Sequence, residues 1–168
     1  AELDWCFAMS YCRQRAFDKA VPYFYNIAGY KESKANFKSI IEAYTGIISA
    51  GDAHTIGLKN DGSVLTAGDN SKGQCDVSQW KDIIEVAAGG SHSVGIRRDK
   101  TVAASGDNSK GQCNTESWKS IIDISAGGAH TVGIENVGRV VAAGDNTYGQ
   151  CDIEDWSGIV SVSAGTSH

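Results

Sequence analysis

The stretch AGGAHTVGIENVGRVVAAGDNTYGQC, residues 126–151, contains a pattern that the chain repeats at a fixed interval of 38 residues. A period of this length indicates an array of structural repeats. The repeats span 51–88, 89–126 and 127–164, and a fourth begins at Gly165. The residues that recur in register are His54, His92, His130 and His168; Trp80, Trp118 and Trp156; Cys75, Cys113 and Cys151; and the first residues of the Gly-Asp-Asn triplets, Gly68, Gly106 and Gly144.

Each repeat has the pattern of short β-strands joined by tight turns. In the third repeat, residues 121–126, 130–134 and 139–143 are runs of apolar or alternating residues bounded by glycine or Asn/Asp turns. In the first repeat, Asn60-Asp61-Gly62 lies between two such runs and predicts a hairpin. Three strands and a short fourth near Gln112-Cys113 would form one four-stranded propeller blade.

Two sequence patterns together resemble the regulator of chromosome condensation repeat family. They are Ala-Gly-x-x-His-Thr before a glycine turn and Gly-Asp-Asn-x-x-Gly-Gln-Cys after it, and the resemblance extends from Gly46 to His168. It implies a β-propeller, usually of seven blades. The repeats are shorter and more uniform than in the eukaryotic nucleotide-exchange factor of the family, and they end in Cys where Leu is common. They look more like bacterial members, so exchange activity is not carried over.

The first 45 residues have a helical pattern instead. Apolar residues recur at steps of three and four, which is typical of amphipathic helices. Ala8, Tyr11, Ala20 and Phe24 resemble one tetratricopeptide unit, a helical hairpin, and a third helix follows it. We therefore predict an α+β chain with two parts, a helical segment at 1–45 and an all-β partial propeller of about three four-stranded blades at 46–168.

Composition excludes several classes of function. With 15 basic and 20 acidic residues the net charge is −5, which disfavours nucleic acid and anionic membranes as partners. The five cysteines include no Cys-x-x-Cys pair, so we expect reduced thiols and a cytoplasmic protein.

The recurring polar residues have structural interpretations that we favour over chemical ones. Histidines one blade apart cannot converge on a metal ion, and a hydrogen bond from each ring to a turn backbone would hold neighbouring blades together. The cysteines have no recurring base beside them, and Asp-Asn after Gly is typical of a turn. The tryptophans could stack on sugars or bases, but their period favours packing between blades. We predict no catalytic residue, no metal and no cofactor, and hence no enzyme.

Positions that vary among the repeats are the candidates for binding a partner, because invariant positions maintain the stack. The sequence therefore predicts a non-catalytic protein-interaction module or scaffold whose protein partner it does not identify. It could also associate with itself or be completed as a propeller by a longer chain. The alternatives are a propeller-type enzyme inhibitor, a guanine-nucleotide exchange factor-like regulator and a purely structural role. The candidate partner-binding residues are Lys72, Lys110, Tyr148, Gln79, Glu116, Glu154 and Asp155.

Overall fold

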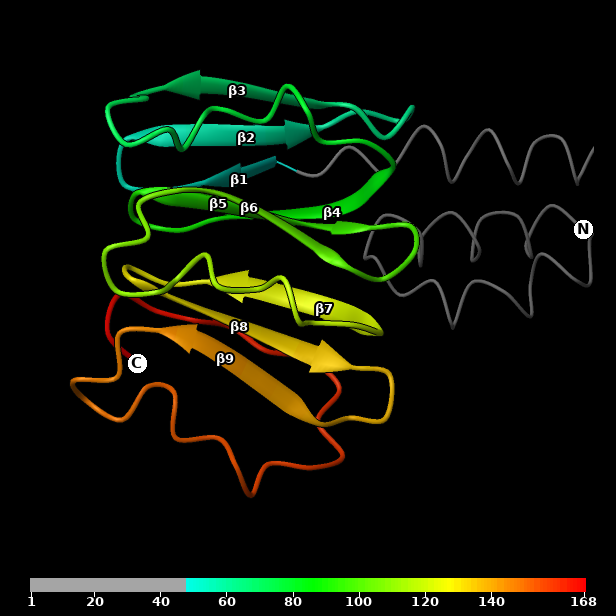
Figure 1. The fold of residues 1–168 in the computed structure, drawn as a ribbon, viewed down its shortest axis with the longest axis vertical. Helices are drawn as coiled ribbons and strands as arrows, with labels where there is room; N and C mark the ends of the chain where they lie inside the picture. The colour runs from blue at the N-terminus through cyan, green and yellow to red at the C-terminus, as the bar shows by residue number, and fades with distance from the viewer. Residues whose placement is uncertain (1–47) are drawn as a thin grey trace, which may run out of the picture. The chain divides into compact units, whose positions relative to one another are not determined.

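The computed structural model describes residues 48–168, and the helical segment predicted for residues 1–45 lies outside this range. The described part contains nine strands in three antiparallel sheets, each with its strands in chain order (Figure 1). No helix in this part is long and apolar enough to cross a membrane. The sheets are β1 (Ile48–Ala50), β2 (His54–Leu58) and β3 (Val64–Gly68); β4 (Ile83–Ala88), β5 (His92–Arg97) and β6 (Val102–Gly106); and β7 (Ile121–Ala126), β8 (His130–Glu135) and β9 (Val140–Gly144).

Each sheet is a meander whose turns follow from its local sequence. The hairpin predicted at Asn60-Asp61-Gly62 is confirmed, since β2 pairs with β3 from His54 opposite Gly68 to Leu58 opposite Val64. Gly62 has φ +81°, in the left-handed region that glycine enters at little cost. The three strands predicted between 121 and 143 correspond to β7, β8 and β9.

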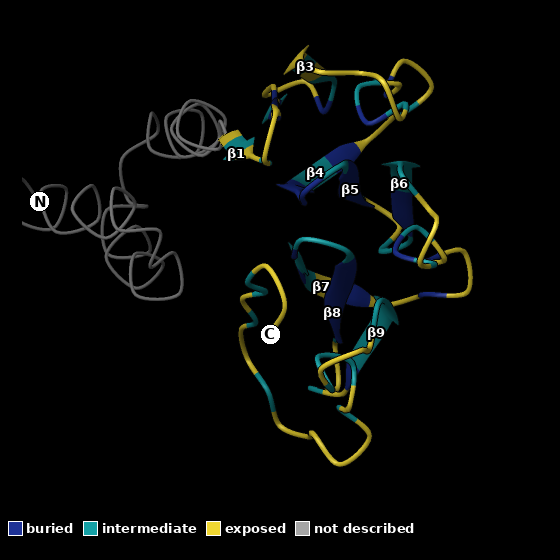
Figure 2. Ribbon diagram, turned by 90° about the vertical axis from the view of Figure 1, so that its left-hand side faces the viewer, coloured by how far each residue is buried: buried dark blue, intermediate teal, exposed yellow. Residues whose placement is uncertain are grey.

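The sheets pack face to face, with β1, β4 and β7 as neighbours, and the core lies between them. One apolar cluster joins Ile56 and Leu58 of the first sheet to Ile83 and Val86 of the second. The next cluster joins Val94 of β5 to Ile121 of β7 in the same way. Figure 2 shows the result, in which the middle strands β5 and β8 are buried and the outer loops are exposed. A blade therefore depends on its neighbour for burial of its apolar faces.

The prediction of a fourth strand in each blade was wrong, because each sheet has three strands. The segment near Gln112-Cys113 forms turns instead. Its backbone is held by side chains, since Cys113 N donates to Asn108 Oδ1 at 2.9 Å and Lys110 N donates to Gln112 Oε1 at 2.9 Å. Asparagine, aspartate and glutamine side chains compete in this way with a strand ladder.

Residues 159–164 lie beside β7. Their position relative to β7 corresponds to that of β7 relative to β4. Ile159 N donates to Gly138 O at 3.1 Å, as Ile121 N donates to Lys100 O at 3.1 Å one repeat earlier. Ala164 N donates to Ser125 Oγ at 2.9 Å, which matches the bond from Ala88 N to Ser49 Oγ at 3.0 Å. Residues 159–164 thus have the position of a first strand, but they form no sheet.

Candidate functional site

The repeated histidines join consecutive blades through a hydroxyl group. His92 Nε2 lies 2.9 Å from Thr131 Oγ1, and that hydroxyl donates to Gln112 O at 2.8 Å. His54 forms the same arrangement with Ser93 Oγ at 2.9 Å, and Ser93 donates to Gln74 O at 2.8 Å. Since each hydroxyl gives its one proton to a carbonyl, it accepts from the ring, and Nε2 carries the ring proton. We predicted a bond from the ring to the backbone; the structure inserts a hydroxyl between them.

Burial keeps these rings neutral. It lowers the pKa of His92 to about 4, and it also lowers the pKa of His54 and of His130. A buried neutral histidine contributes its full stability above the ordinary pKa of 6.5, and this stability is lost as the pH falls toward 4, because the unfolded chain takes up protons first. Within residues 48–168, no three His, Cys, Asp or Glu side chains are grouped so that they could hold a metal ion.

We therefore expect EDTA to leave the melting temperature of the protein unchanged. The reason is that His54 and His92 bond to hydroxyls and the Asp-Asn turns bond to their own loops, so that these groups within residues 48–168 are held without a metal. Differential scanning calorimetry with and without EDTA makes the measurement. A drop of several degrees that zinc or calcium reverses would contradict the structural role.

The Gly-Asp-Asn loops are closed networks of hydrogen bonds. The Asp107 carboxylate accepts from Ser109 N at 3.2 Å and from the Ser109 hydroxyl at 3.0 Å, and these bonds lower the pKa of Asp107. The thiol of Cys113, which is half-buried, donates to Asp107 O at 3.4 Å. Burial raises the pKa of Cys113 to about 11, so this thiol stays protonated and is a poor nucleophile.

The repeated tryptophans lie at the junctions between blades. Trp118 is 7% exposed and packs in the cluster between the second and third sheets. A Cβ atom on Gly133 would lie 3.0 Å from Cζ3 of Trp118, so the indole occupies the space above a glycine of the next blade. Trp80 packs against the preceding cluster, and Cζ3 of its ring takes the same place over Gly95. Trp156 is 49% exposed.

The seven candidate partner-binding residues are all exposed. Lys72, Lys110 and Tyr148 lie in the loops that follow β3, β6 and β9, at one end of successive blades (Figure 1). Lys110 Nζ also lies 3.4 Å from Asp145 Oδ1 of the next blade, so Lys110 forms an ion pair within the stack. Tyr148, at the equivalent position, is 76% exposed. Gln79, Glu116, Glu154 and Asp155 lie further along the segments that connect one blade to the next.

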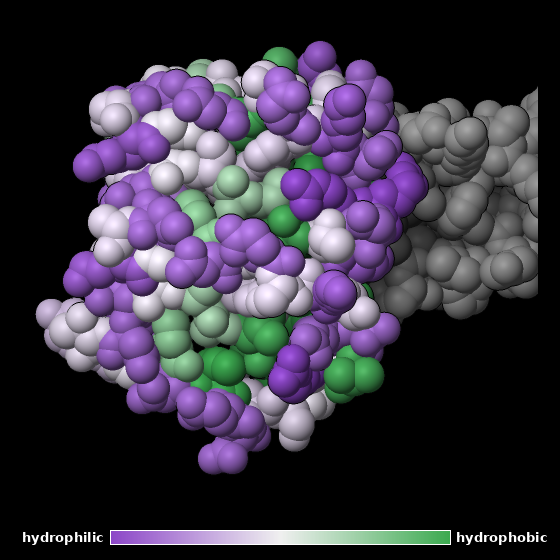
Figure 3. All heavy atoms as spheres, viewed as in Figure 1, coloured by the Kyte–Doolittle hydropathy of each residue, from purple (hydrophilic) through white to green (hydrophobic). Residues whose placement is uncertain are grey.

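Polar side chains cover most of the face shown in Figure 3, and apolar ones appear between them, most clearly over β8 and β9. This mixture is usual for a solvated protein surface, to which apolar atoms contribute a large share.

Sequence reasoning missed a pair of carboxyl groups on the innermost strands. Glu85 of β4 and Asp123 of β7 occupy equivalent positions, each beside a register shift in its strand. Burial, together with the neighbouring Asp123, raises the pKa of Glu85 to about 7. The signal was present as an acidic residue at the same place in two otherwise apolar runs.

Replacing Glu85 by glutamine should stabilise the protein relative to wild type as the pH rises. A carboxyl group whose pKa is raised in the folded state contributes stability below its ordinary pKa of 4.5 and loses it as the pH rises through about 7. The free-energy difference between Glu85→Gln and wild type should therefore grow by on the order of 2 kcal/mol between pH 5 and 8. Urea unfolding at each pH tests this, and a difference independent of pH would contradict it.

Comparison with known proteins assigns the class of the fold. The regulator of chromosome condensation (RCC1) repeat matches residues 47–74, 83–112 and 121–150, which is about half of the chain. The chain belongs to this repeat family. No curated protein matches it.

Solved structures of similar fold are repeat propellers. Prp20p from Saccharomyces cerevisiae is 17% identical, with a TM-score of 0.55 over 62% of this chain and 32% of that one. The CRINKLY WD40 ectodomain of the Arabidopsis thaliana receptor kinase ACR4 is 25% identical, with a TM-score of 0.54 over 71% of this chain and 42% of that one. Human WBSCR16 is 18% identical, with a TM-score of 0.53 over 66% and 37%. The chain spans about a third to two-fifths of the length of these structures.

Proposed function

We propose that the chain is a non-catalytic protein-interaction module or scaffold built from propeller repeats. One observation carries the proposal: the recurring side chains contact the stack itself, while the seven varying candidate residues are exposed. The same division favours binding over catalysis, because the chemically reactive residue types are held in bonds to their own blade or its neighbour.

A protein of similar fold binds other proteins, which supports a binding role for this chain. Prp20p binds Gsp1p and histones. In a further structure, yeast RCC1 (Prp20) is bound to Kap60. Both structures are 18% identical or less to this chain, so these partners are not transferred to it.

The outer face of the third blade supports a second part of the proposal, that another blade of the same repeat packs there. His130 Nε2 is buried near the backbone of His168 but makes no hydrogen bond of normal geometry. Trp156 is 49% exposed where Trp118 is 7% exposed. At the other end of the stack, Thr55 is the residue of the first blade that corresponds to Ser93 and Thr131, and it is exposed. A blade that presents a hydroxyl and a glycine at these places would satisfy both groups, whether it comes from a second copy or from a longer chain.

Light scattering with dilution tests this packing. If a second copy supplies the blade, the chain associates, and Thr55→Arg abolishes the association while Asn60→Arg, in the adjacent turn, does not. If a longer chain supplies the additional blade, that longer protein is monomeric. The fluorescence of Trp156 is then protected from quenching by iodide. A dilution-resistant monomer of residues 1–168 with a high melting temperature would contradict the packing.

Partner binding is tested with quantitative affinity purification from cells that contain the protein naturally. The wild-type chain should retain a stoichiometric protein partner. A variant with Tyr148→Asp and Glu116→Lys should lose it, whereas Asn60→Ala, an exposed change in a hairpin turn, should retain it. Equal retention by all three chains would contradict the assignment of the binding face.

A further inference from the structure

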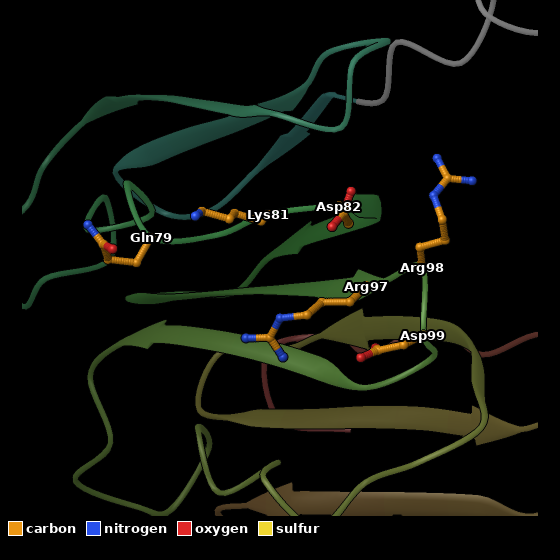
Figure 4. Close-up of a pocket in the computed structure, with 6 residues that line it drawn as sticks. All are labelled: Gln79, Lys81, Asp82, Arg97, Arg98 and Asp99. Atoms are coloured by element: carbon orange, nitrogen blue, oxygen red, sulfur yellow. The ribbon is translucent and has the colours of Figure 1, made fainter.

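A groove lies beside the second blade. Of the seven candidate partner-binding residues, only Gln79 lines it. The groove has a volume of about 570 Å³ and is lined by Gln79, Lys81, Asp82, Arg97, Arg98 and Asp99. Residues 79–82 come from the segment that leads into β4, Arg97 is the last residue of β5, and residues 98–99 lie in the turn between β5 and β6. Figure 4 shows Gln79, Lys81 and Arg97 extending to the same side of the groove, whereas Arg98 extends away from them.

Arg97 is held in place before any ligand arrives. Its Nη1 donates to Val102 O at 2.9 Å and to Thr101 Oγ1 at 3.2 Å. The guanidinium keeps other N–H groups for a ligand, because it has five in all. A cation fixed by its own strand loses little conformational entropy on binding.

The acidic residues of the groove offset part of its positive charge, but not all of it. Asp99 accepts from Thr101 N at 3.0 Å and from the Thr101 hydroxyl at 2.7 Å, and these bonds lower its pKa. Asp99 therefore stabilises the turn in which it lies. With Asp82, the groove has two carboxylates against three cations, in a chain whose net charge is −5.

The groove is specific to the second blade and is not part of what the repeats share. The residues equivalent to Arg97 and Arg98 are Lys59 and Asn60 in the first blade and Glu135 and Asn136 in the third. In the third blade, Glu135 Oε2 accepts from Nε of Arg139 at 2.9 Å, which gives that turn an internal ion pair. Because the stack forms without two arginines at this turn, they are available for a ligand.

We propose that this groove binds an acidic segment of a protein partner, whose carboxylates are recognised by Lys81 and Arg97 on one side of the groove and by Arg98, which lines it but extends away from these two. The inference rests on the proposed function and names the chemistry of the partner. Alternating cations and carboxylates suit a peptide, which has amides as well as acids, better than a continuous polyphosphate. Gln79 can pair with a peptide amide, and the negative charge of the whole chain opposes a nucleic acid.

The test uses the full chain and a fluorescein-labelled decaglutamate peptide, with fluorescence anisotropy at low and at physiological salt. Wild type should bind it with a Kd that rises with salt. Lys81→Glu and Arg98→Glu should each weaken binding about tenfold or more, since like charges then face the peptide. Lys119→Glu is the matched control, because Lys119 has the position of Lys81 one blade later, beside Glu135 in place of Arg97. It should bind as wild type does.

Three results would overturn the proposal. They are the absence of decaglutamate binding, an equal loss in Lys119→Glu, and tighter binding of a ten-nucleotide single-stranded DNA than of the peptide. Both groove substitutions are at exposed positions, and circular dichroism of each variant verifies its fold. If the groove does not bind the peptide but the chain still retains a partner through the loops of Tyr148 and Glu116, only this inference fails and the proposed function is unaffected.

Discussion

Valine in place of Gly106 should leave no cooperatively folded protein. Gly106 has φ +115°, and a Cβ atom there would lie 2.6 Å from Ser91 O and 2.7 Å from His92 Cα, both backbone atoms of the adjoining strand. A β-branched side chain adds conformational strain to this overlap, so the cost should exceed about 4 kcal/mol, a large part of the stability of a small domain. We expect the same of Gly68 and Gly144, which have φ +109° and +123°.

Circular dichroism during thermal unfolding measures this effect, and Gly158→Asp is its control. Gly158 also has a positive φ, +68°, but nothing lies within 4 Å of the Cβ position. The equivalent positions are occupied by Asp82 at φ +53° and Ser120 at φ +58°. The control should therefore melt close to wild type. Soluble valine variants that melt cooperatively at all three glycines would contradict the close approach of the strands.

Thr131→Val should destabilise the protein by about 2–5 kcal/mol. Valine keeps the shape of threonine but removes the hydroxyl between His92 Nε2 and Gln112 O. Two buried polar groups then lose their partners, and each unsatisfied group costs about 1–3 kcal/mol. Equilibrium unfolding in urea gives the difference directly.

The chain provides its own control for this substitution. Thr55 has the position of Thr131 in the first blade, but it is exposed and forms no side-chain hydrogen bond within residues 48–168. Thr55→Val, measured at a concentration at which the chain is monomeric, should change stability by less than about 0.5 kcal/mol, as is usual for surface substitutions. Equal effects at the two positions would mean that the hydroxyl contributes through its own strand and not through the junction between blades.

Much of the fold could be predicted from the sequence, because strands and turns depend on local patterns. Asn60-Asp61-Gly62 predicted its hairpin, and residues 121–143 predicted three strands close to their observed bounds. The turn at Asp107-Asn108 was predicted, but local pattern could not reveal that the Asn108 side chain would hold the backbone of Cys113 in a turn where a short strand was expected. That outcome depends on side-chain geometry that composition does not specify.

The site was less predictable, since its contacts join residues one repeat apart. The period identified His92 and Trp118, but the hydroxyl of Thr131 and the glycine beneath Trp118 emerge only when two blades are placed together. Lys81 recurs as Lys119 but Arg97 recurs in no pattern, and the two line one groove because the turn after β5 faces the segment that leads into β4. The available signal was the departure of Arg97 and Arg98 from the residues at the same positions in the other two repeats.

The bond from His92 to Thr131 is the contact on which the structural role of the repeated histidines depends, and NMR observes it directly. A long-range ¹H–¹⁵N spectrum of the full chain, with His92→Gln to assign the signal, reports which ring nitrogen carries the proton. The geometry predicts a neutral ring protonated at Nε2, slow to exchange and unchanged down to about pH 5, since the pKa of His92 is about 4. A proton on Nδ1, or a charged ring at pH 6, would contradict the junction between blades.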